Sequence, residues 1–416
     1  MHAIFASLGT DGDIFPYLAL GVVLRRRGHR VTAVFSEEYR SRTVGLGLEF
    51  RALVSAEENR ELFDNPDFWH PLKGGKIGAD WGVSKIPATH ATLMELVSQG
   101  DAVLIVNPAI LAARVIQDHL GTPTATMVLQ PWMLPSIEVP PIMPAGLTMP
   151  AWAPWPMKWL YFQMLETVGY VLLGRQLNAF RAALGLPRVW RVFKWWLSPE
   201  LVIGMFPEWF GKPEKDWPPH TTLAGFSRFD GQENAELSAD VAAFCKAGAA
   251  PLVVTAGTGM MHAAGLFHAA ADACRRLGMR AIFLTRHTSQ LPNPLPPTIL
   301  QAAYAPFSRL FPLCAAVVHH GGVGTAAAAL AAGVPQLVLP QAFDQFDNAV
   351  RLKRLGVARY LSVRNRRGIL MARELRFLLR AGVKARCATL ATKAAGGSGL
   401  EIAANLVERL VQQRIA

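Results

Sequence analysis

The stretch Ala316–Arg354 constrains the fold most, because it alternates short apolar runs with turns and helix-forming segments. An apolar run of strand type opens it, and the glycine-rich turn 319–325 follows at once. Residues 326–332, mostly alanine, can only reasonably form a helix, and a glycine and a proline shortly after them end it. A second apolar run follows at 336–339, and 347–355 has the pattern of another helix. The stretch therefore predicts a β-α-β-α unit.

The glycine-rich turn predicts an anion-binding site at the carboxyl end of a strand. Its backbone N–H groups are unpaired, and the next helix directs the positive end of its dipole to the same place. We expect His319, at the end of the strand, to donate a hydrogen bond to a phosphate oxygen. Backbone groups for a diphosphate are expected from Gly321, Gly322, Gly324 and Thr325. The alternative is an ordinary βα turn with a structural histidine.

Two other strand ends in the same half of the chain add polar groups to this site. Asp344 and Gln345 follow the second strand and offer acceptors and donors suited to sugar hydroxyls. Gly257 and Thr258 follow an apolar run at 252–255 and add backbone N–H groups. No pair of acidic residues suited to a metal ion follows a strand here. We therefore expect the helix terminus to supply the counter-charge, without a metal or any other cofactor.

The pattern of His, Gly-Gly, Gly-Thr, Ala-Gly-Val-Pro-Gln and Asp-Gln resembles the nucleotide-sugar-binding signature of family-1 glycosyltransferases, enzymes of the GT-B fold. The segment 304–306 is similar to the base-binding segment of that family. This similarity implies that Tyr304 stacks on the nucleobase and that the backbone of Ala305 and Phe307 reads its edge. The loop 9–13 is similar to the first N-terminal loop of bacterial members, so the resemblance runs along most of the chain.

Within the family, the sequence is most similar to the rhamnosyltransferases of rhamnolipid synthesis. The shared segments are 206–210, 216–218, 229–231 and 344–348. The resemblance implies transfer of L-rhamnose from dTDP-L-rhamnose to a hydroxyl of a hydrophobic lipid-type acceptor, with inversion at the anomeric carbon. Plant-type members have tryptophan where this chain has Tyr304 and Gly322, which points to thymine as readily as uracil. UDP-glucose as donor, with a sterol, polyketide or other small apolar acceptor, is the alternative.

A glycosyl transfer also needs a base for the acceptor hydroxyl, and the loop after the first strand offers Asp11 and Asp13. A partly desolvated aspartate can accept the proton as the hydroxyl attacks, and a second carboxylate nearby raises its pKa further. By resemblance to bacterial members, Asp13 is the base, with Asp11 beside it and Gly12 at the acceptor. An alternative, compatible with the first, is that Asp13 caps the helix that begins at Pro16.

Residues 130–217 differ in composition and contain nine of the eleven tryptophans, among many prolines and methionines. Tryptophan and methionine bury large areas while adapting to irregular chains. We therefore expect this segment to line an apolar acceptor pocket, with Trp132 and Trp155 at the acceptor. The alternatives are an ordinary core and a surface that faces a lipid monolayer.

A chain of 416 residues is too long for one ordinary core and suits two α/β domains. We expect the GT-B architecture, with two doubly wound Rossmann-like domains facing a central cleft. The N-terminal, acceptor-binding domain is expected over 1–228, with a linker at 227–235. The C-terminal, nucleotide-sugar-binding domain is expected over 236–395. By resemblance, the last segment, 396–416, forms a helix that crosses back to the first domain.

The net charge of +12 comes almost entirely from residues 351–386, which hold twelve Lys or Arg residues and one acid. Arg373, Arg376 and Arg380 fall at helical spacing, so one helix face is strongly basic. A solvated surface helix is the first interpretation, and contact with an anionic inner-membrane surface or lipid is the second. Nucleic acid is not expected as a partner, because aromatic residues are not interleaved there.

Other features exclude whole classes of protein. No uninterrupted run of about 18 apolar residues occurs, and the first residues lack the features of a signal peptide, so we expect a soluble cytoplasmic protein. The four cysteines have no metal-ligand spacing and are expected to be reduced core residues. Two further functions stay open. A sugar-nucleotide epimerase needs the diphosphate site but no acceptor pocket, and a non-catalytic auxiliary protein only stabilises a partner transferase.

Overall fold

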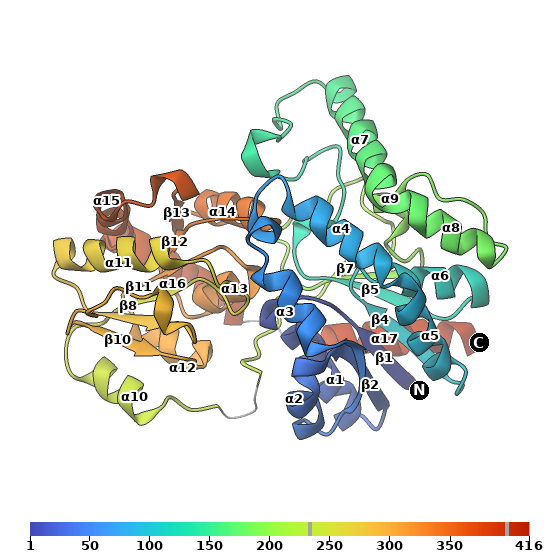
Figure 1. The fold of residues 1–416 in the computed structure, drawn as a ribbon, viewed down its shortest axis with the longest axis horizontal. Coiled ribbons are helices and arrows are strands. Elements are labelled where there is room, and N and C mark those ends of the chain that lie inside the picture. Colours follow the sequence, from blue (N-terminus) through green and yellow to red (C-terminus); the bar gives the residue numbers. More distant parts are fainter. Residues whose placement is uncertain (232–234, 396–398, 416) are drawn as a thin grey trace. The chain divides into compact units, whose positions relative to one another are not determined.

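The computed structural model describes residues 1–231, 235–395 and 399–415 of the 416-residue chain (Figure 1). The chain divides into two compact units. Unit 1 comprises residues 1–227 and 398–416, and unit 2 comprises residues 228–397. Residues 232–234 of the predicted linker, and residues 396–398 and 416 of the predicted C-terminal segment, lie outside the described residues.

Unit 1 is built on a parallel sheet with the strand order β3-β2-β1-β4-β5-β6-β7. The strands are β1 His2–Ala6, β2 Arg30–Ser36, β3 Glu49–Val54, β4 Ala102–Val106, β5 Thr124–Val128, β6 Leu201–Gly204 and β7 Thr221–Leu223. The order reverses between β1 and β4. In an open parallel sheet, ligands bind at such a reversal, outside the carboxyl ends of the strands. The loop after β1, which leads to Asp13, therefore lies where this topology places a site.

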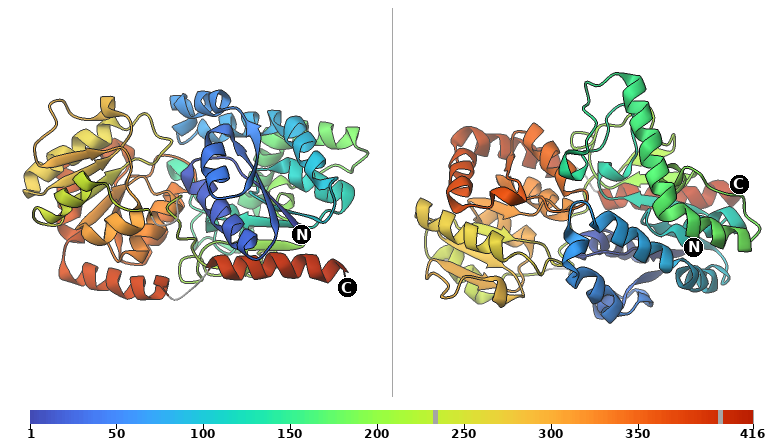
Figure 2. Two further views of the ribbon diagram at one scale, coloured as in Figure 1. Left: turned by 90° about the horizontal axis from the view of Figure 1, so that it is seen from below. Right: turned by 45° about the horizontal axis from the view of Figure 1, so that its top comes forward.

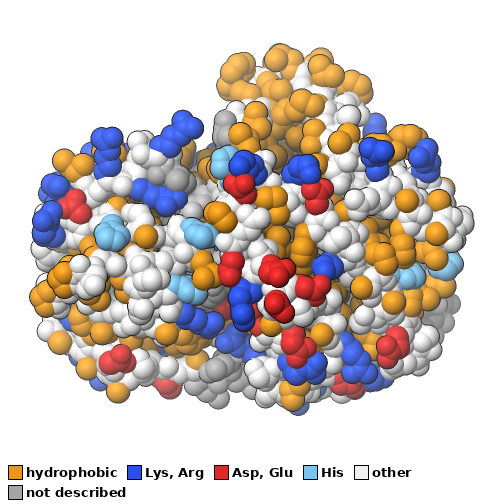
Figure 3. All heavy atoms as spheres, viewed as in Figure 1, with side chains coloured by type: hydrophobic (Ala, Val, Ile, Leu, Met, Phe, Trp, Pro, Cys, Tyr) orange, Lys and Arg blue, Asp and Glu red, His pale blue; other side chains and the backbone are white. Residues whose placement is uncertain are grey.

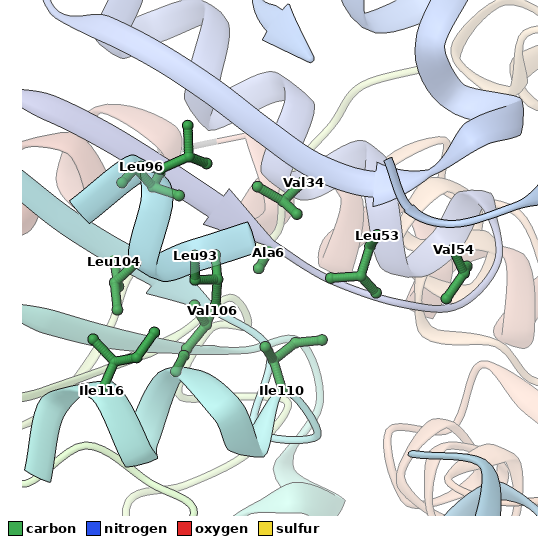
Figure 4. Close-up of a cluster of buried hydrophobic side chains, with 12 residues drawn as sticks. Ala6, Val34, Leu53, Val54, Leu93, Leu96, Leu104, Val106, Ile110 and Ile116 are labelled. Carbon is green, nitrogen blue, oxygen red and sulfur yellow. The ribbon is translucent and has the colours of Figure 1, made fainter. Parts of the chain in front are cut away.

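Helices alternate with these strands. They are α1 Asp11–Arg26, α2 Arg40–Gly45, α3 Ala56–Asp64, α4 Gly74–Ser84, α5 Ile86–Val97, α6 Leu111–Leu120, α7 Trp155–Gly169, α8 Arg175–Ala183 and α9 Val192–Trp195. Figure 4 shows part of the core, where Leu93 and Leu96 of α5 and Ile116 of α6 lie with Leu104 and Val106 of β4. These five side chains are at most 1% exposed. Each contributes about 1.5–3 kcal/mol by burial, more than a typical surface ion pair.

The helix α17, Gly399–Ile415, follows unit 2 in the sequence but belongs to unit 1. Figure 2 shows it lying along the unit that holds the N-terminus. Ala403 and Val407 on its inner face are fully buried. Arg27, at the end of α1, donates a hydrogen bond to Glu408 at 2.7 Å. The predicted return of the C-terminal helix to the first domain is confirmed.

Unit 2 is a second parallel sheet, with the strand order β10-β9-β8-β11-β12-β13. The strands are β8 Leu252–Thr255, β9 Ala281–Leu284, β10 Ile299–Ala302, β11 Ala316–His319, β12 Gln336–Val338 and β13 Ala358–Tyr360. The helices are α10 Ala239–Lys246, α11 Ala264–Leu277, α12 Phe307–Leu310, α13 Val323–Ala331, α14 Gln345–Arg354, α15 Gly368–Leu378 and α16 Ala381–Ala395. The predicted fold class, with two doubly wound parallel sheets, is confirmed.

Element boundaries in the β-α-β-α unit differ from those predicted. The strand β11 includes His319, and α13 begins at Val323 instead of Ala326. The helix α14 begins at Gln345 instead of Asp347. Propensity alone starts a helix at the first alanine, because glycine is a poor helix former. In the structure, contacts between the glycine-rich turn and neighbouring residues determine where these helices begin.

Between β5 and β6, unit 1 carries a long segment that includes α7, a π-helical turn at Tyr170–Gly174 that continues α7, and α8 and α9. Tyr161 and Phe162 of α7 face inward and are 9% exposed. Gly169 packs so closely on Phe193 of α9 that a Cβ atom there would lie 2.6 Å from its ring. Across 1–231, 235–395 and 399–415, no helix has both the length and the apolar character that crossing a membrane requires.

Candidate active site

The strand order of unit 2 reverses between β8 and β11, so the loops after these two strands are neighbours. The ring of His320 fills the space between them. A Cβ atom on Gly257 would lie 2.7 Å from its Cε1 atom, and a Cβ atom on Gly322 would lie 2.4 Å from its Nε2 atom. Gly257 also has a φ angle of +90°, which favours glycine. Glycine is therefore required at both positions while the histidine occupies this place.

His319 is a structural residue. Its side chain is fully buried, its Nδ1 atom accepts a hydrogen bond from the Gly321 N–H at 3.1 Å, and its Nε2 atom lies 3.0 Å from Oε1 of Gln336. Because Nδ1 accepts, the ring proton is on Nε2 and is donated to the Gln336 oxygen. Burial lowers the pKa of His319 to about 3, so the ring is neutral. Both nitrogens are occupied, and the prediction that His319 donates to a phosphate is wrong.

His320 is the histidine that the sequence interpretation missed. Its Nδ1 atom is buried and has no hydrogen-bond partner among the described residues. Burial lowers the pKa of His320 to about 4, so near pH 7 the ring is neutral, with one N–H and one acceptor nitrogen. Adjacent residues of an extended segment point to opposite sides, so only one of the two histidines could face the turn. The strand was predicted to end at Val318, which made His319 the first residue of the turn. Since β11 includes His319, the first residue after the strand is His320.

The N-terminus of α13 lies at the same place. Gly322 is its N-cap, and Gly324 and Thr325 lie in its first turn, which holds no acidic residue. The first N–H groups of a helix have no partner within it, and the helix dipole adds about half a positive charge there. Thr258, in the loop after β8, is exposed. Together with the neutral His320, the turn offers hydrogen-bond donors and a positive potential to an anion.

The loops after β11 and β12 are joined by side chains of α14. Nδ2 of Asn348 donates to the Gly321 carbonyl at 2.9 Å and to Oδ2 of Asp344, the N-cap of α14, at 2.7 Å. Oε1 of the buried Gln345 accepts from the Gln341 N–H at 2.8 Å. The Gln345 oxygen holds the loop and is not available to a sugar hydroxyl, which corrects the prediction for that atom. Asp344 is half-buried beside the glycine turn, and its sugar-binding role stays a prediction.

The predicted base-binding segment follows β10, at the edge of the sheet. Tyr304 is 37% exposed, and its hydroxyl donates to the Asp230 carbonyl at 2.6 Å, while Ala305 is buried. The Asp230 carboxylate accepts from the N–H groups of Phe307 at 3.1 Å and Ser308 at 3.2 Å. The Phe307 N–H is therefore occupied, which corrects the prediction for that group, while a role of the Ala305 backbone stays a prediction. Stacking of a base on Tyr304 stays a prediction.

In unit 1, Asp13 lies at the corresponding reversal of strand order. It is the third residue of α1, and its Oδ2 atom accepts a hydrogen bond from the N–H of Thr10, the N-cap residue, at 2.9 Å. A Cβ atom on Gly9, whose φ angle is +131°, would lie 2.2 Å from the same oxygen. Asp13 thus has a capping role, but in a helix that begins at Asp11 with Thr10 as its N-cap and not at Pro16 as predicted. The Oδ1 atom has no hydrogen bond among the described residues.

The environment of Asp13 raises its pKa to about 6, chiefly because burial disfavours the charged form and in smaller part because Asp11 is close. Hydrogen bonds from Thr10 oppose this rise. A carboxylate with such a pKa can accept and release a proton near neutral pH, as a general base must. Asp11, by contrast, accepts from the Tyr39 hydroxyl at 3.0 Å and lies 3.7 Å from the Arg42 guanidinium. Its oxygen is held by these neighbours.

The three predicted acceptor residues have different surroundings. A Cβ atom on Gly12 would meet no atom of the described residues within 4 Å, so the position is open. Trp132 follows β5, at the same edge of the sheet as Asp13, and its buried Nε1 atom has no partner among the described residues. Trp155, the first residue of α7, is 54% exposed. Acceptor contact stays a prediction for all three.

The basic segment 351–386 forms a depression of about 520 Å³ beside α15. Its lining side chains are Arg359, Arg373, Glu374, Arg376, Phe377 and Arg380. The buried Glu374 pairs with Arg359 at 2.7 Å and with Arg373 at 2.8 Å. Arg376 and Arg380 have no ion-pair partner among the residues that the structure describes. The predicted basic helix face is therefore present.

Metal-ligating side chains and thiols are the remaining candidates for chemistry in the two units. In the described part of the chain, no three His, Cys, Asp or Glu side chains are grouped as a metal site. Cys274 and Cys387 are buried, Cys245 and Cys314 are half-buried, and none forms a disulfide. Burial raises the pKa of Cys274 to about 12, so its thiol stays protonated.

Two family comparisons match different parts of the chain. Residues 3–138 match the family described as Glycosyltransferase family 28 N-terminal domain. Residues 280–408 match the family described as Erythromycin biosynthesis protein CIII-like, C-terminal domain.

Similar proteins and structures agree with these matches. The chain is 28% identical to the O-mycaminosyltylonolide 6-deoxyallosyltransferase of Streptomyces fradiae, over 100% of this chain and 98% of that protein. It is 26% identical to the sterol 3-beta-glucosyltransferase of Debaryomyces hansenii, over 88% of this chain but 24% of that longer protein. The spinosyn rhamnosyltransferase SpnG complexed with thymidine diphosphate has a TM-score of 0.69 at 21% identity, covering 99% of this chain and 100% of that one. The chain is a nucleotide-sugar-dependent glycosyltransferase of the GT-B fold.

Proposed function

We propose that the chain transfers L-rhamnose from dTDP-L-rhamnose to a hydroxyl of a lipid-type acceptor, with inversion and without a metal ion, as in rhamnolipid synthesis. The observation that carries the proposal is the anion site of unit 2. There the neutral His320, with a buried unpartnered nitrogen, lies against Gly257 and Gly322 at the N-terminus of α13. A departing diphosphate needs this kind of preorganised donor set.

The leaving group gains negative charge as the bond between the anomeric carbon and the diphosphate oxygen breaks. The N–H groups at the start of α13 would stabilise that charge, and the imidazole of His320 would add a further donor. Because the pKa of His320 is about 4, the ring donates as a neutral group and its protonation does not change near pH 7.

Asp13 in unit 1 is the proposed base. As the acceptor oxygen attacks the anomeric carbon, the carboxylate takes the hydroxyl proton, the new C–O bond forms and the bond to the diphosphate breaks. Attack on the side opposite the leaving group inverts the configuration. With a pKa of about 6, most Asp13 carboxyls are ionised at pH 7 and above, ready to accept the proton.

The names of similar proteins support the choice of donor. One relative is a 6-deoxyallosyltransferase, and the similar structure is a rhamnosyltransferase complexed with thymidine diphosphate. Both names contain a deoxysugar, and the second adds thymidine diphosphate. The lipid-type acceptor is supported by the resemblance in segments 206–210 and 344–348. The sterol 3-beta-glucosyltransferase favours a second candidate, transfer of glucose from UDP-glucose to a sterol or another apolar acceptor.

Transfer assays with the full chain test the proposal. dTDP-L-rhamnose and UDP-glucose are each incubated with a hydroxyacyl lipid and with a sterol, and the products are identified by mass spectrometry and NMR of the anomeric proton. We expect a rhamnosylated hydroxyacyl lipid of inverted configuration. Product only from UDP-glucose and the sterol would establish the second candidate.

Donor controls separate the remaining functions. Isomerised sugar nucleotide from donor alone would indicate an epimerase. Protection by thymidine diphosphate against thermal unfolding, combined with no turnover of any donor, would indicate an auxiliary protein. We expect stronger protection by thymidine diphosphate than by uridine diphosphate.

A further inference from the structure

The α7 extension, which we define as residues 152–171, presents an apolar face to the outside of unit 1. Aliphatic side chains recur on α7 and its continuation at intervals of three and four residues, which places them on one side of a helix. These are Met157, Leu160, Met164, Val168 and Val171, and they are 45% to 64% exposed. An ordinary surface helix carries polar residues on its outer side.

Tryptophans extend this apolar face at the beginning of α7. Trp152 is 84% exposed, Trp155 is 54% exposed and Trp159 is 42% exposed. Trp190, before α9, is 61% exposed and stacks on Tyr170 with ring centroids 5.0 Å apart. Figure 3 shows hydrophobic side chains covering the part of the surface where Figure 1 places α7. The face is therefore continuous over several turns.

The charged residues in the sequence of α7 are turned away from this face. Lys158 is buried and donates to the Glu138 carbonyl at 3.1 Å. Glu166 is half-buried and accepts from the Phe193 N–H at 3.1 Å. Both side chains thus anchor the helix, and neither charge lies on its outer side.

The surroundings of the α7 extension are basic. Residues 138–200 hold six Lys or Arg residues and three acids, Glu138, Glu166 and Glu200. Two of the bases are buried, and the exposed ones are Arg175, Arg188, Arg191 and Lys194. A second copy of this chain on the same face would bring these four cations together, with Glu138 as the one exposed acid of residues 138–200 to meet them. An anionic lipid surface matches both the charge and the apolar stripe.

We propose that the α7 extension docks on an anionic phospholipid membrane. The aliphatic stripe and the tryptophans enter the region between headgroups and acyl chains, and the four exposed cations contact lipid phosphates. Tryptophan suits this depth because its ring is apolar and its N–H is polar. The proposal does not depend on the identity of the sugar donor or the acceptor.

Vesicle sedimentation of the full chain, without donor or acceptor, tests the proposal. We expect binding to vesicles that contain phosphatidylglycerol, and weaker binding to pure phosphatidylcholine vesicles or at high salt. The variant Leu160→Ser/Met164→Ser/Val168→Ser should bind at least about tenfold more weakly, because it removes apolar contact. The matched control Val44→Ser/Leu72→Ser/Leu120→Ser changes residues that are 49% to 59% exposed elsewhere in unit 1 and should bind like the unchanged chain.

Two charge variants locate the electrostatic contact. Arg188→Gln/Arg191→Gln/Lys194→Gln should lose most of the preference for phosphatidylglycerol, and Arg376→Gln/Arg380→Gln, in the basic depression of unit 2, should keep it. The proposal would be overturned if only Arg376→Gln/Arg380→Gln lost the preference for phosphatidylglycerol. It would also be overturned if the triple-serine α7 variant bound vesicles like its control. Absence of vesicle binding by the unchanged chain would also overturn it.

Two further measurements distinguish membrane docking from self-association and from a change in catalysis. Light scattering that shows a dimer, dissociated by the triple-serine α7 variant, together with no vesicle binding, would favour a second copy as the occupant and overturn the proposal. Transfer to a short, water-soluble hydroxyacyl acceptor should be unchanged in that variant. Failure of this transfer reaction in the unchanged chain would contradict the proposed function and leave the vesicle result to stand alone.

Discussion

The carboxyl edges of the two sheets share a topology but differ in chemistry. In each unit the strand order reverses beside the first strand, and a helix begins at that point. Unit 1 places the carboxyl group of Asp13 there, and burial raises its pKa to about 6. Unit 2 places the imidazole of His320 there, and burial lowers its pKa to about 4. Burial disfavours charge in both cases, so one edge acquires a proton acceptor and the other a neutral hydrogen-bond donor.

The largest expected effect concerns the proton acceptor. Replacement of Asp13 by Asn keeps the size of the side chain and an oxygen for the Thr10 N–H, but removes the basic carboxylate. We expect turnover to fall by on the order of 10²-fold or more, with nearly unchanged affinity for thymidine diphosphate. Single-turnover rates and calorimetric titration measure the two quantities. Asp11→Asn is the control, and unchanged turnover in the Asp13 variant would remove Asp13 from the base role.

The second effect separates the two adjacent histidines. His320→Ala should weaken binding of thymidine diphosphate by about 1.5–3 kcal/mol, which is about 10- to 150-fold in Kd. His319→Ala should instead lower the free energy of unfolding by about 1–3 kcal/mol, because it leaves Gln336 and the Gly321 N–H without their partner. Calorimetry and urea unfolding check both. The reverse pattern would contradict the assignment of His320 to the anion site.

The third effect is the pH dependence of kcat/KM. Asp13 must be ionised to accept a proton, and its pKa is raised from 3.8 to about 6. The rate should therefore be constant above this value and fall about tenfold for each pH unit below it. An acid limb that stayed near pH 4 would show that the carboxyl is not desolvated during catalysis. The residual activity of the Asp13→Asn variant should lack the limb.

The smallest expected effect tests the source of positive charge in unit 2. If helix α13 and His320 stabilise the leaving diphosphate, removal of divalent metal ions should leave turnover unchanged. Dialysis against EDTA, followed by the transfer assay with and without added Mg²⁺, checks this. If turnover fell after dialysis and added Mg²⁺ restored it, a metal ion would be needed to stabilise the leaving diphosphate.

Local signals in the sequence were enough to predict both sheets and the positions of both edges. Apolar runs, glycine-rich turns and helix periodicity are short-range features, and the reversal of strand order follows from the βαβ pattern. The direction of single side chains is a different matter. The roles of His319 and of the Gln345 oxygen were wrong because they depend on Gln336 and on the backbone of Gln341. Those contacts join different strands and loops.

The extent to which burial raises the pKa of Asp13, and the outward direction of the apolar face of α7, could not be predicted, because both depend on packing. The sequence suggested partial desolvation and a second carboxylate as causes of a raised pKa. Burial is the main cause, and its extent depends on packing. The composition of residues 130–217 indicated an apolar segment with three interpretations. The structure shows that Lys158 and Glu166 point inward and that the aliphatic side chains of α7 are exposed.

The place of α17 has a consequence for synthesis on the ribosome. Unit 2 is an insertion within unit 1, since the chain enters it after residue 227 and returns to unit 1 for α17. The nascent chain emerges from the N-terminus, so unit 2 can fold while the seat of Ala403 and Val407 on unit 1 is still uncovered. During that interval the growing polypeptide displays an apolar strip to chaperones and to other chains, until α17 emerges and covers it.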